Sequence, residues 1–325
     1  MKLRVAINGF GRIGRCFLRA ASSDPTVEIV AVNDLGDKEN LLYLLQYDSV
    51  YGRFDKDISH IQFLNEKDPA KLPWKNLSVD VAVESTGVFD SFEKASAHIT
   101  AGAKRVVISA PVKDSMPNAA TVLIGVNEQK FQTCTITSNA SCTTNSASPL
   151  IAILDEALGI ERALLNTVHA YTATQSIVDA PVKGEDKRRG RAAAHNITPS
   201  STGAAIAVTK AYEQLAGKFD GIAVRVPVVA GSIVDITFVA KRETSAAEVN
   251  SILEKAATEQ RWRGIFAVTK EPLVSSDIIG QPYGSIADLA MTRVVGNLVK
   301  VLAWYDNEMG YAHTLLRHVK EAGKQ

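Results

Sequence analysis

A glycine-rich motif near the amino terminus constrains the fold more than any other feature of this sequence. Gly9, Gly11 and Gly14 follow an apolar run, residues 3–8, that is typical of a short buried strand, and a helical pattern comes next. In such a unit the first glycine permits a tight turn, the second lets the backbone approach a pyrophosphate, and the third lets helix and strand pack closely. The diphosphate would rest on the helix amino terminus. The motif therefore predicts a dinucleotide-binding, doubly wound sheet of the Rossmann type.

The chain continues this alternating pattern as far as residue 140. Apolar runs predict helices at 38–46 and 91–99 and strands at 27–32, 79–83, 105–109 and 121–125, whereas 48–74 looks irregular. Asp34 follows the second strand about 20 residues after the glycines, where an acid is expected to bind the ribose hydroxyls of the adenosine. Because a carboxylate there would repel a 2′-phosphate, the predicted cofactor is NAD.

Length and composition set the broad class. The chain has 325 residues, of which 46% are hydrophobic, so we expect about two domains with ample core. A net charge of +1 gives no argument for nucleic acid as a partner. Three cysteines are an odd number in a long chain, which favours a reducing compartment such as the cytoplasm. No apolar run is long enough to predict a membrane span, and the first residues lead directly into the motif, unlike a signal peptide.

The second half of the sequence has fewer helices. Apolar patterns predict strands at 162–169, 221–227, 233–240 and 299–305 and helices at 245–259 and 308–320. Runs of strands with few helices indicate a mixed, largely antiparallel sheet in an α+β domain. Between them lies a long loop, residues 171–199, which carries a basic run at 183–191, and a loop of this length without secondary structure is typical of a functional segment.

The stretch 138–145 places Cys142 among small hydroxyl and amide side chains, directly before an apolar helical run. The helix dipole and free backbone N–H groups at a helix start favour the thiolate. An ordinary thiol has a pKa of about 8.5, and lowering it by one unit takes roughly 1.4 kcal/mol, which a helix start plus a protonated histidine would supply. We therefore predict a reactive Cys142 with a lowered pKa. The alternative is a buried structural thiol, as we expect for Cys16 and Cys134.

Taken in order, six motifs resemble phosphorylating glyceraldehyde-3-phosphate dehydrogenases, and the resemblance covers essentially the whole chain: 7–15, 138–145, 169–175, 201–205, 225–227 and 304–308. It implies an NAD-binding domain at 1–141, completed by the C-terminal helix 308–325, and a catalytic domain at 142–307. It also implies a cytoplasmic homotetramer of glycolysis, with the long loop packed between subunits.

The resemblance also assigns roles to residues. Cys142 would attack the aldehyde to form a thiohemiacetal, His169 would act as its base, hydride would pass to NAD, and inorganic phosphate would cleave the resulting thioester. The substrate phosphate would bind Thr172, Thr174, Arg189 and Arg225, and inorganic phosphate would bind Ser141, Thr143, Thr202 and Gly203. NAD would contact Gly9, Phe10, Gly11, Arg12, Ile13, Asp34, Lys67, Thr86, Gly87, Ser109 and Asn307.

Two departures and two alternatives accompany this resemblance. Thr174 stands where many bacterial relatives have an acid, and segment 51–67 is shortened, as though a β-hairpin near Lys67 were lost. One alternative is an erythrose-4-phosphate dehydrogenase. The other is an NAD-binding redox sensor or interaction protein in which Cys142 is oxidised. The histidines show no metal-ligand spacing, so we expect no metal.

Overall fold

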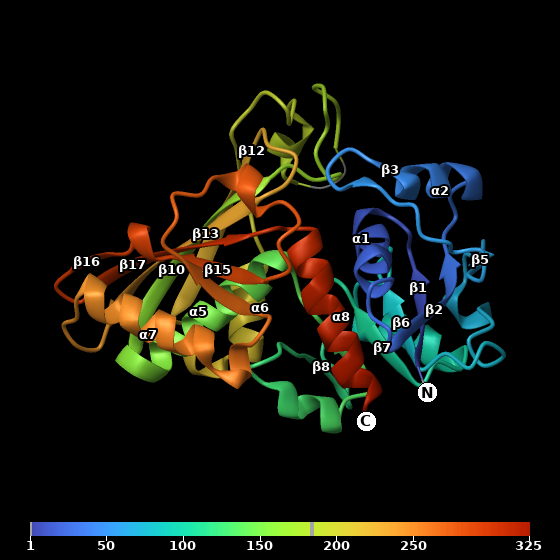
Figure 1. Cartoon of the computed structure of the whole chain (residues 1–325), viewed down its shortest axis with the longest axis horizontal. Coiled ribbons are helices and arrows are strands. Elements are labelled where there is room, and N and C mark those ends of the chain that lie inside the picture. Colours follow the sequence, from blue (N-terminus) through green and yellow to red (C-terminus); the bar gives the residue numbers. More distant parts are fainter. Residues whose placement is uncertain (1, 183–184) are drawn as a thin grey trace. The chain divides into compact units, whose positions relative to one another are not determined.

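The computed structural model describes residues 2–182 and 185–325, so residues 183 and 184 of the basic run lie outside the described part. The chain divides into two units. One comprises the chain up to Ser141 together with Ala312–Gln325, and the other is Cys142–Tyr311 (Figure 1). We describe each unit by itself.

Seven strands, all paired in parallel, form the sheet of the first unit in the order β5-β2-β1-β6-β7-β9-β8. They are β1 (Leu3–Asn8), β2 (Val27–Asn33), β5 (Gln62–Leu64), β6 (Val81–Glu84), β7 (Arg105–Ile108), β8 (Ala119–Thr121) and β9 (Ile136–Ser138). The strand order reverses at β1, which lies between β2 and β6. In open parallel sheets ligands bind at the carboxyl ends of the strands at such a reversal. The predicted doubly wound sheet is confirmed.

The helices of this unit follow the predicted pattern with local differences. They are α1 (Arg12–Ala21), α2 (Lys38–Gln46), α3 (Phe92–Ala95), α4 (Ala97–Thr100) and, from Ala312 onward, α8 (Met309–Gly323), with 3-10 turns η1 (Pro69–Lys71) and η2 (Glu128–Gln132). Helix α2 begins after Asp37, whose carboxylate accepts a hydrogen bond from the Asn40 N–H and caps the helix. Cys16 and Cys134 are buried, as predicted.

Three predictions for this unit were wrong in detail. The segment predicted as irregular contains β5 and a small hairpin of β3 (Tyr47–Asp48) and β4 (Gly52–Arg53). The predicted helix at 91–99 is broken at Ser96 into α3 and α4. The strand predicted at 121–125 is instead β8, because the Asn127 side chain accepts from the Leu123 N–H and closes a turn there.

The second unit contains an eight-stranded mixed sheet, with β11-β12-β10-β13-β17-β15-β14 in order and β16 paired to β17. Its strands are β10 (Ile160–Ala170), β11 (Thr198–Ser201), β12 (Phe219–Val226), β13 (Ser232–Ala240), β14 (Phe266–Thr269), β15 (Ser285–Asp288), β16 (Arg293–Val295) and β17 (Leu298–Tyr305). Only the β10–β12 and β14–β15 pairs are parallel. The predicted mixed, largely antiparallel sheet is confirmed.

Helices pack against one face of this sheet (Figure 1). They are α5 (Cys142–Leu158), α6 (Ala204–Ala211) and α7 (Ala246–Thr258), with 3-10 turns η3 (Lys187–Gly190), η4 (Glu213–Leu215), η5 (Gln260–Trp262), η6 (Ser275–Ile278) and η7 (Leu289–Met291). Side chains alternate along β10, so that Leu165 and Thr167 are buried while Leu164 on the opposite face is 66% exposed. The sheet is therefore covered on one face within the unit and partly apolar on the other.

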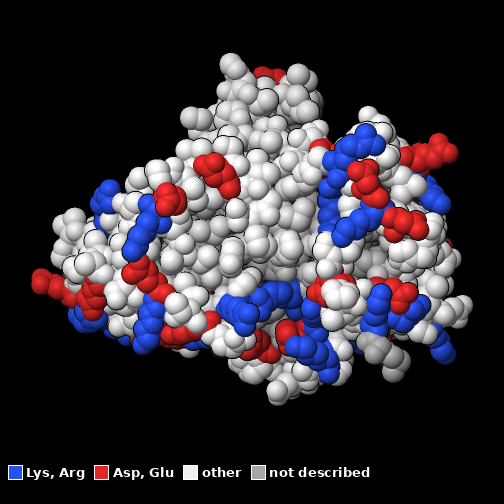
Figure 2. Space-filling model, in the orientation of Figure 1, with Lys and Arg blue, Asp and Glu red and all other residues white. Residues whose placement is uncertain are grey.

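The surface charge is mixed. Basic and acidic side chains are interspersed over the face drawn in Figure 2, in keeping with the net charge of +1. Within the described ranges, none of the helices combines the length and the apolar character that crossing a membrane requires.

Candidate active site

The glycine-rich turn after β1 has the geometry of a phosphate-binding loop. Gly9 has a φ of +96°, which favours glycine, and a Cβ on Gly14 would lie 2.2 Å from the Gly9 carbonyl oxygen, so helix and turn pack in contact. A Cβ on Gly11 would meet nothing within 4 Å, so the backbone is open to a ligand there. Gly11 precedes α1 without a side-chain cap. This turn and helix start fit the diphosphate of a dinucleotide.

Asp34 is held against this turn. Its Oδ2 accepts from the Phe10 N–H at 2.6 Å, and its Oδ1 accepts from the Gly36 N–H at 2.7 Å. The predicted ribose acid therefore lies next to the predicted diphosphate loop, at the carboxyl edge of the sheet.

The next strands bring further predicted residues to the same edge. Thr86 and Gly87 follow β6, and the Ser109 N–H donates to the Glu84 carbonyl at 2.9 Å. A Cβ on Gly9 would lie 2.5 Å from the Thr86 nitrogen, so the two loops touch. Ile13 in α1 is half-buried, and Lys67 is exposed beyond β5.

The side chain of Arg12 has a different partner from the one expected. Its Nη1 donates to Asp48 Oδ2 at 2.6 Å, and its guanidinium lies over the Tyr51 ring. A cofactor contact from Arg12 would therefore come from its backbone.

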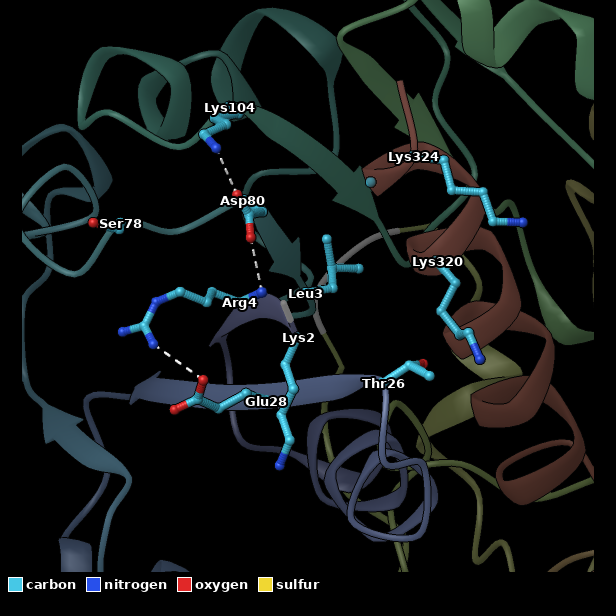
Figure 3. Close-up of a pocket in the computed structure, with 11 residues that line it drawn as sticks. Lys2, Leu3, Arg4, Thr26, Glu28, Ser78, Asp80, Lys104, Lys320 and Lys324 are labelled. Atoms are coloured by element: carbon cyan, nitrogen blue, oxygen red, sulfur yellow. Dashed lines mark hydrogen bonds and ion pairs between the residues drawn. The ribbon is translucent and has the colours of Figure 1, made fainter.

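The first unit also has a cavity of about 780 Å³ away from these loops (Figure 3). It lies where β1 and β2 begin, and charged side chains around it pair with each other: Arg4 with Glu28 at 3.0 Å and Lys104 with Asp80 at 2.8 Å. Because dinucleotides bind at the carboxyl ends of such strands, this cavity is not the predicted cofactor site.

In the second unit, Cys142 and His169 lie in contact. Cys142 is the first residue of α5, and His169 lies near the end of β10. The Cys142 Sγ is 3.4 Å from His169 Nε2. This separation is within hydrogen-bond reach for a thiol and its base.

The protonation state of this pair differs from the sequence-based prediction. Burial raises the pKa of the Cys142 thiol, although the charge of Arg225 and hydrogen bonds from Thr143 act in the opposite direction. Burial and the charge of Arg225 lower the pKa of His169 to about 3. The predicted lowered thiol pKa, assisted by a protonated histidine, was wrong for the free protein, because the prediction left out desolvation of both groups.

Arg225 controls which nitrogen of His169 carries the proton. It lies opposite His169 in the β10–β12 pair, with Nη1 2.6 Å from His169 Nδ1, and the Ala170 carbonyl oxygen lies 2.6 Å from the same nitrogen. Arginine only donates, so its bond places the imidazole proton on Nε2, facing the sulfur. If Nδ1–H instead donates to Ala170, Nε2 is free to accept the thiol proton.

Three predicted substrate-phosphate residues form one cluster. The hydroxyls of Thr172 and Thr174 are 2.9 Å apart, and Arg189 Nη1 donates to Thr174 Oγ1 at 3.3 Å. Ser200 and Asp186 also bind the Arg189 guanidinium and fix its direction. Burial, and to a smaller extent the positive charge of Arg189, lowers the pKa of Arg225. A guanidinium beside two hydroxyls suits a phosphate dianion.

The residues predicted to bind inorganic phosphate differ in what surrounds them. Gly203 precedes α6 without a side-chain cap, and a Cβ there would meet nothing within 4 Å. Thr202 Oγ1 accepts from the Ala204 N–H at 3.2 Å. Ser141 is half-buried beside Cys142. The Thr143 hydroxyl, however, is 2.9 Å from the Tyr305 hydroxyl and is buried.

Two residues of the site had no predicted role. The Tyr305 hydroxyl joins Thr143 to Thr167, and its ring meets the His169 ring edge-on with centroids 6.0 Å apart. Ser232 Oγ donates to Asn307 Oδ1 at 3.0 Å and accepts from the Ala170 N–H at 3.1 Å. The only sequence signal was the motif 304–308 for Tyr305, since a serine at the start of a strand indicates nothing by itself. Among residues 2–182 and 185–325, no three His, Cys, Asp or Glu side chains are grouped to hold a metal ion.

Comparison with known proteins places this geometry in a family. Residues 3–92 match the family model "Glyceraldehyde 3-phosphate dehydrogenase, NAD binding domain", and residues 141–307 match the corresponding C-terminal domain. The chain is 46% identical to glyceraldehyde-3-phosphate dehydrogenase 2 of Streptomyces avermitilis and to glyceraldehyde-3-phosphate dehydrogenase of Streptomyces coelicolor, over 100% of both chains in each case. It is also 46% identical to glyceraldehyde-3-phosphate dehydrogenase of Mycobacterium avium, over 100% of this chain and 99% of that protein. The chain therefore belongs to the glyceraldehyde-3-phosphate dehydrogenase family.

Proposed function

We propose that this protein catalyses the NAD-dependent, phosphorylating oxidation of D-glyceraldehyde 3-phosphate to 1,3-bisphosphoglycerate. The observation that carries the proposal is the contact of Cys142 Sγ with His169 Nε2 at 3.4 Å, with the cluster of Thr172, Thr174 and Arg189 in the same unit. The first group suits covalent attack on an aldehyde, and the second suits a substrate phosphate. Membership of the family supports the same reaction.

The two parts of the chain divide the task. We assign NAD binding to residues 1–141 with 308–325 and catalysis to 142–307, which agrees closely with the two units of the structure. NAD, when bound, accepts the hydride. The glycine turn and α1 would hold its diphosphate, Asp34 its ribose, and Asn307 its carboxamide, with further contacts from Phe10, Arg12, Ile13, Lys67, Thr86, Gly87 and Ser109.

Covalent chemistry begins at Cys142. With the Nδ1 proton of His169 donated to the Ala170 carbonyl, Nε2 accepts the thiol proton as Sγ bonds to the aldehyde carbon. The carbonyl oxygen then takes this proton from His169 Nε2, which gives the thiohemiacetal and leaves His169 neutral. His169 then removes this hydroxyl proton as hydride leaves the carbon, which gives a thioester.

Inorganic phosphate completes the cycle. A phosphate oxygen attacks the thioester carbon, the C–S bond breaks, and the acyl phosphate leaves while Cys142 regains a proton from His169. We assign this phosphate to Ser141, Thr143, Thr202 and Gly203. Because the Thr143 hydroxyl faces Tyr305, Thr143 would contribute its backbone N–H at the start of α5.

Arg225 would couple binding of the substrate phosphate to the protonation of His169. A phosphate that takes hydrogen bonds from Arg225 removes the donor from His169 Nδ1, so that this nitrogen can carry a proton and Nε2 can act as the base. We propose that substrate binding in this way prepares the base for the substrate that carries a phosphate.

The decisive experiment measures NADH formation from glyceraldehyde 3-phosphate with and without inorganic phosphate. We expect sustained turnover only with phosphate, a stoichiometric burst without it, and no turnover for Cys142→Ser, which should still bind NAD. Faster turnover on erythrose 4-phosphate would replace the proposed substrate. Phosphate-dependent turnover by Cys142→Ser would rule out the nucleophile.

We also propose that the protein is a cytoplasmic homotetramer. Support for assembly comes from the uncovered face of the second sheet, where Leu164 is 66% and Ile222 is 55% exposed. Leu164 borders an open pocket of about 780 Å³ whose lining also includes Ile206 and Leu298, and Ile222 lies on the neighbouring strand β12. An apolar face of this kind favours burial against another subunit.

A further inference from the structure

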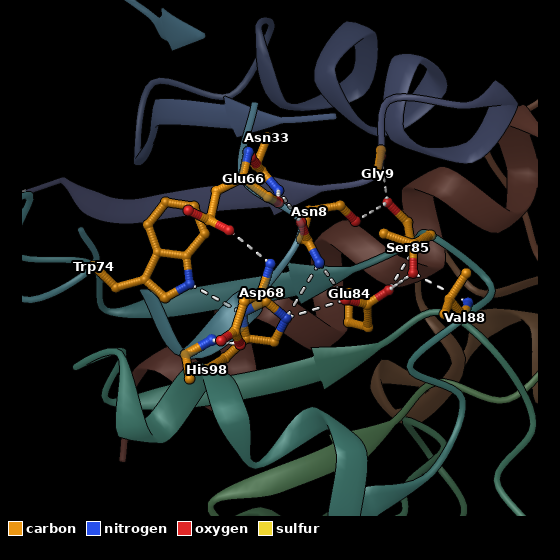
Figure 4. A network of polar contacts seen from close by, with 12 residues as sticks. Asn8, Gly9, Asn33, Glu66, Asp68, Trp74, Glu84, Ser85, Val88 and His98 are labelled. Carbon is orange, nitrogen blue, oxygen red and sulfur yellow. Dashed lines mark hydrogen bonds and ion pairs between the residues drawn. The ribbon is translucent and has the colours of Figure 1, made fainter. Parts of the chain in front are cut away.

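A chain of buried hydrogen bonds lies beneath the loops that carry the predicted cofactor residues (Figure 4). Asn8, Asn33, Glu84 and His98 are each at most 4% exposed, and Trp74 is fully buried. None of these residues has an assigned role in the reaction. Burying so many polar groups is costly unless each one has a partner, so the arrangement of donors and acceptors must be specific.

The direction of each bond can be worked out from Trp74. Its indole N–H only donates, and it lies 2.9 Å from His98 Nδ1, so this nitrogen is the acceptor and the ring proton is on Nε2. The Nε2–H then donates to Glu84 Oε2 at 3.0 Å. Trp74 is itself fixed in the core beside Ala6 and Val79, and its ring is inclined to that of His98 by 27° with centroids 6.2 Å apart.

The other end of the chain starts at the backbone of Glu66. Its N–H donates to Asn33 Oδ1 at 2.8 Å, so Asn33 Nδ2 faces Asn8 and donates to Asn8 Oδ1 at 2.7 Å. This leaves Asn8 Nδ2 to donate to Glu84 Oε2 at 2.6 Å. Both side-chain amides therefore have only one orientation that satisfies every partner.

The two ends meet at Glu84, which accepts from every neighbour. Asn8 and His98 donate to Oε2, and the N–H and hydroxyl of Thr86 donate to Oε1. The Thr86 hydroxyl also accepts from the Val88 N–H, which leaves its own proton for Glu84. The Glu84 carboxyl group therefore accepts from four donors and lies at the centre of the network.

Four members of the network adjoin or bind a predicted cofactor residue. Asn8 precedes Gly9, Asn33 precedes Asp34, and Glu66 precedes Lys67, while Glu84 directly binds Thr86. The network therefore joins four loops that come from distant parts of the sequence but lie at one edge of the sheet.

We propose that Glu84, oriented by His98 and Asn8, is a positioning residue that sets the four loops at the spacing NAD requires. The inference rests on the proposed function, because it concerns the same cofactor. Its physical basis is that one buried carboxylate fixes the loops after β1 and β6 directly, and those after β2 and β5 through Asn8 and Asn33.

The test uses the exchange of an amide and a carboxylate. In Glu84→Gln, an NH₂ group must face either the Thr86 N–H or the donors of Asn8 and His98, so one side loses its acceptor. In Asn8→Asp, two carboxylates lie in contact.

The double variant, which combines Asn8→Asp with Glu84→Gln, restores the pairing. The new amide at position 84 accepts from Thr86 and donates to the new carboxylate at position 8, which also accepts from Asn33. Because the Asn8 amide nitrogen lies 3.4 Å from His98 Nε2, the carboxylate that replaces the amide accepts from that ring too.

We expect NAD titrated calorimetrically into full-length Glu84→Gln to show a Kd at least about tenfold above that of the wild type. The KM for NAD should rise in parallel, with kcat at saturating NAD changed by less than about threefold. The double variant should return the Kd to within about threefold of the wild-type value, a rescue that loss of packing alone would not produce.

Val106→Ala serves as the matched control, since Val106 is buried in the same sheet in a separate part of the core. It should lower the Tm while leaving the NAD Kd within about twofold. A folded Glu84→Gln protein that binds NAD like the wild type would overturn the inference, and so would a double variant as weak as the single one.

The remaining outcomes are also decisive. If Glu84→Gln does not fold, a folded double variant with near-wild-type affinity supports the pairing. If neither folds, Trp74→Phe decides: it frees His98 Nδ1, and an unchanged NAD Kd would refute the network's role. Wild-type protein that binds no NAD would instead overturn the proposed function itself.

Discussion

At the scale of single residues, the neutral pairing of Cys142 with His169 has a measurable consequence. Because burial raises the pKa of the thiol, its thiolate fraction should increase about tenfold per pH unit across the neutral range. We therefore expect the rate of alkylation by iodoacetamide, without substrate, to rise steadily from pH 6 to 8. Peptide mass spectrometry should find Cys16 and Cys134 unmodified, since both are buried. A rate that is flat over this range would indicate a thiolate–imidazolium pair instead.

Ser232 gives a second prediction at this scale. Ser232→Ala removes one donor to Asn307 Oδ1 and the acceptor for the buried Ala170 N–H, so Asn307 is held less firmly, by the Gly231 N–H at 3.1 Å. We expect the KM for NAD to rise about three- to tenfold, in line with a lost hydrogen bond of about 1 kcal/mol. Ser285→Ala is the matched control. That buried hydroxyl has no hydrogen-bond partner among the described residues, and its removal should leave the KM unchanged.

The sequence identified the residues of the site better than it predicted their protonation. The motifs pointed to Cys142, His169 and Arg225, and the structure places these three side chains in contact. The direction of the thiol pKa was not predictable, because desolvation depends on what packs around a group after folding. Ser232 was missed for a similar reason: its partners are 62 and 75 residues away in the sequence.

At the scale of elements, the length of each helix or strand decided whether the sequence could predict it. The buried strand β1 and the helix α2 were predicted with the bounds that the structure has, since a complete apolar run marks the first and an amphipathic pattern marks the second. Strands β5, β11 and β16 have at most four residues, too few for a recognisable alternation, and they form because neighbouring strands offer an edge. Tertiary pairing, which the local sequence does not encode, also explains β14 and β15.

Helix α7 offers a test of local encoding. Ser245 precedes it and accepts a hydrogen bond from the Glu248 N–H at 3.2 Å, which caps the helix. Ser245→Ala should lower the free energy of unfolding by about 1 kcal/mol, seen in calorimetry as a Tm lower by about 2–4 °C. Ser245→Asp should retain the cap. The same Ser→Ala change at exposed Ser251, inside the helix, should leave the Tm equal or slightly higher. Equal losses at both serines would argue against capping.

At the scale of the whole molecule, the order of motifs along the chain was the strongest predictor. Six short motifs pointed to one family, and the family matches span both halves of the chain. Assembly was harder to predict from the sequence, because the pattern of β10 identifies an apolar outer residue but does not indicate what covers it. The structure offers one candidate surface for assembly, the uncovered face of the second sheet, where Leu164 and Ile222 are exposed.

That face leads to a prediction about assembly. Leu164→Asp places a charge on the apolar face without disturbing the core beneath it, because Leu164 is 66% exposed. If the face is buried between subunits, a desolvated and unpaired carboxylate should dissociate them, and light scattering after size exclusion should show a smaller particle than the tetramer proposed for the wild type. Val274→Asp is the control, at an apolar residue that is 57% exposed elsewhere in the same unit. It should leave the mass unchanged. A Leu164→Asp protein that remains tetrameric would move the interface to another surface, and a monomeric wild type would refute the proposed assembly.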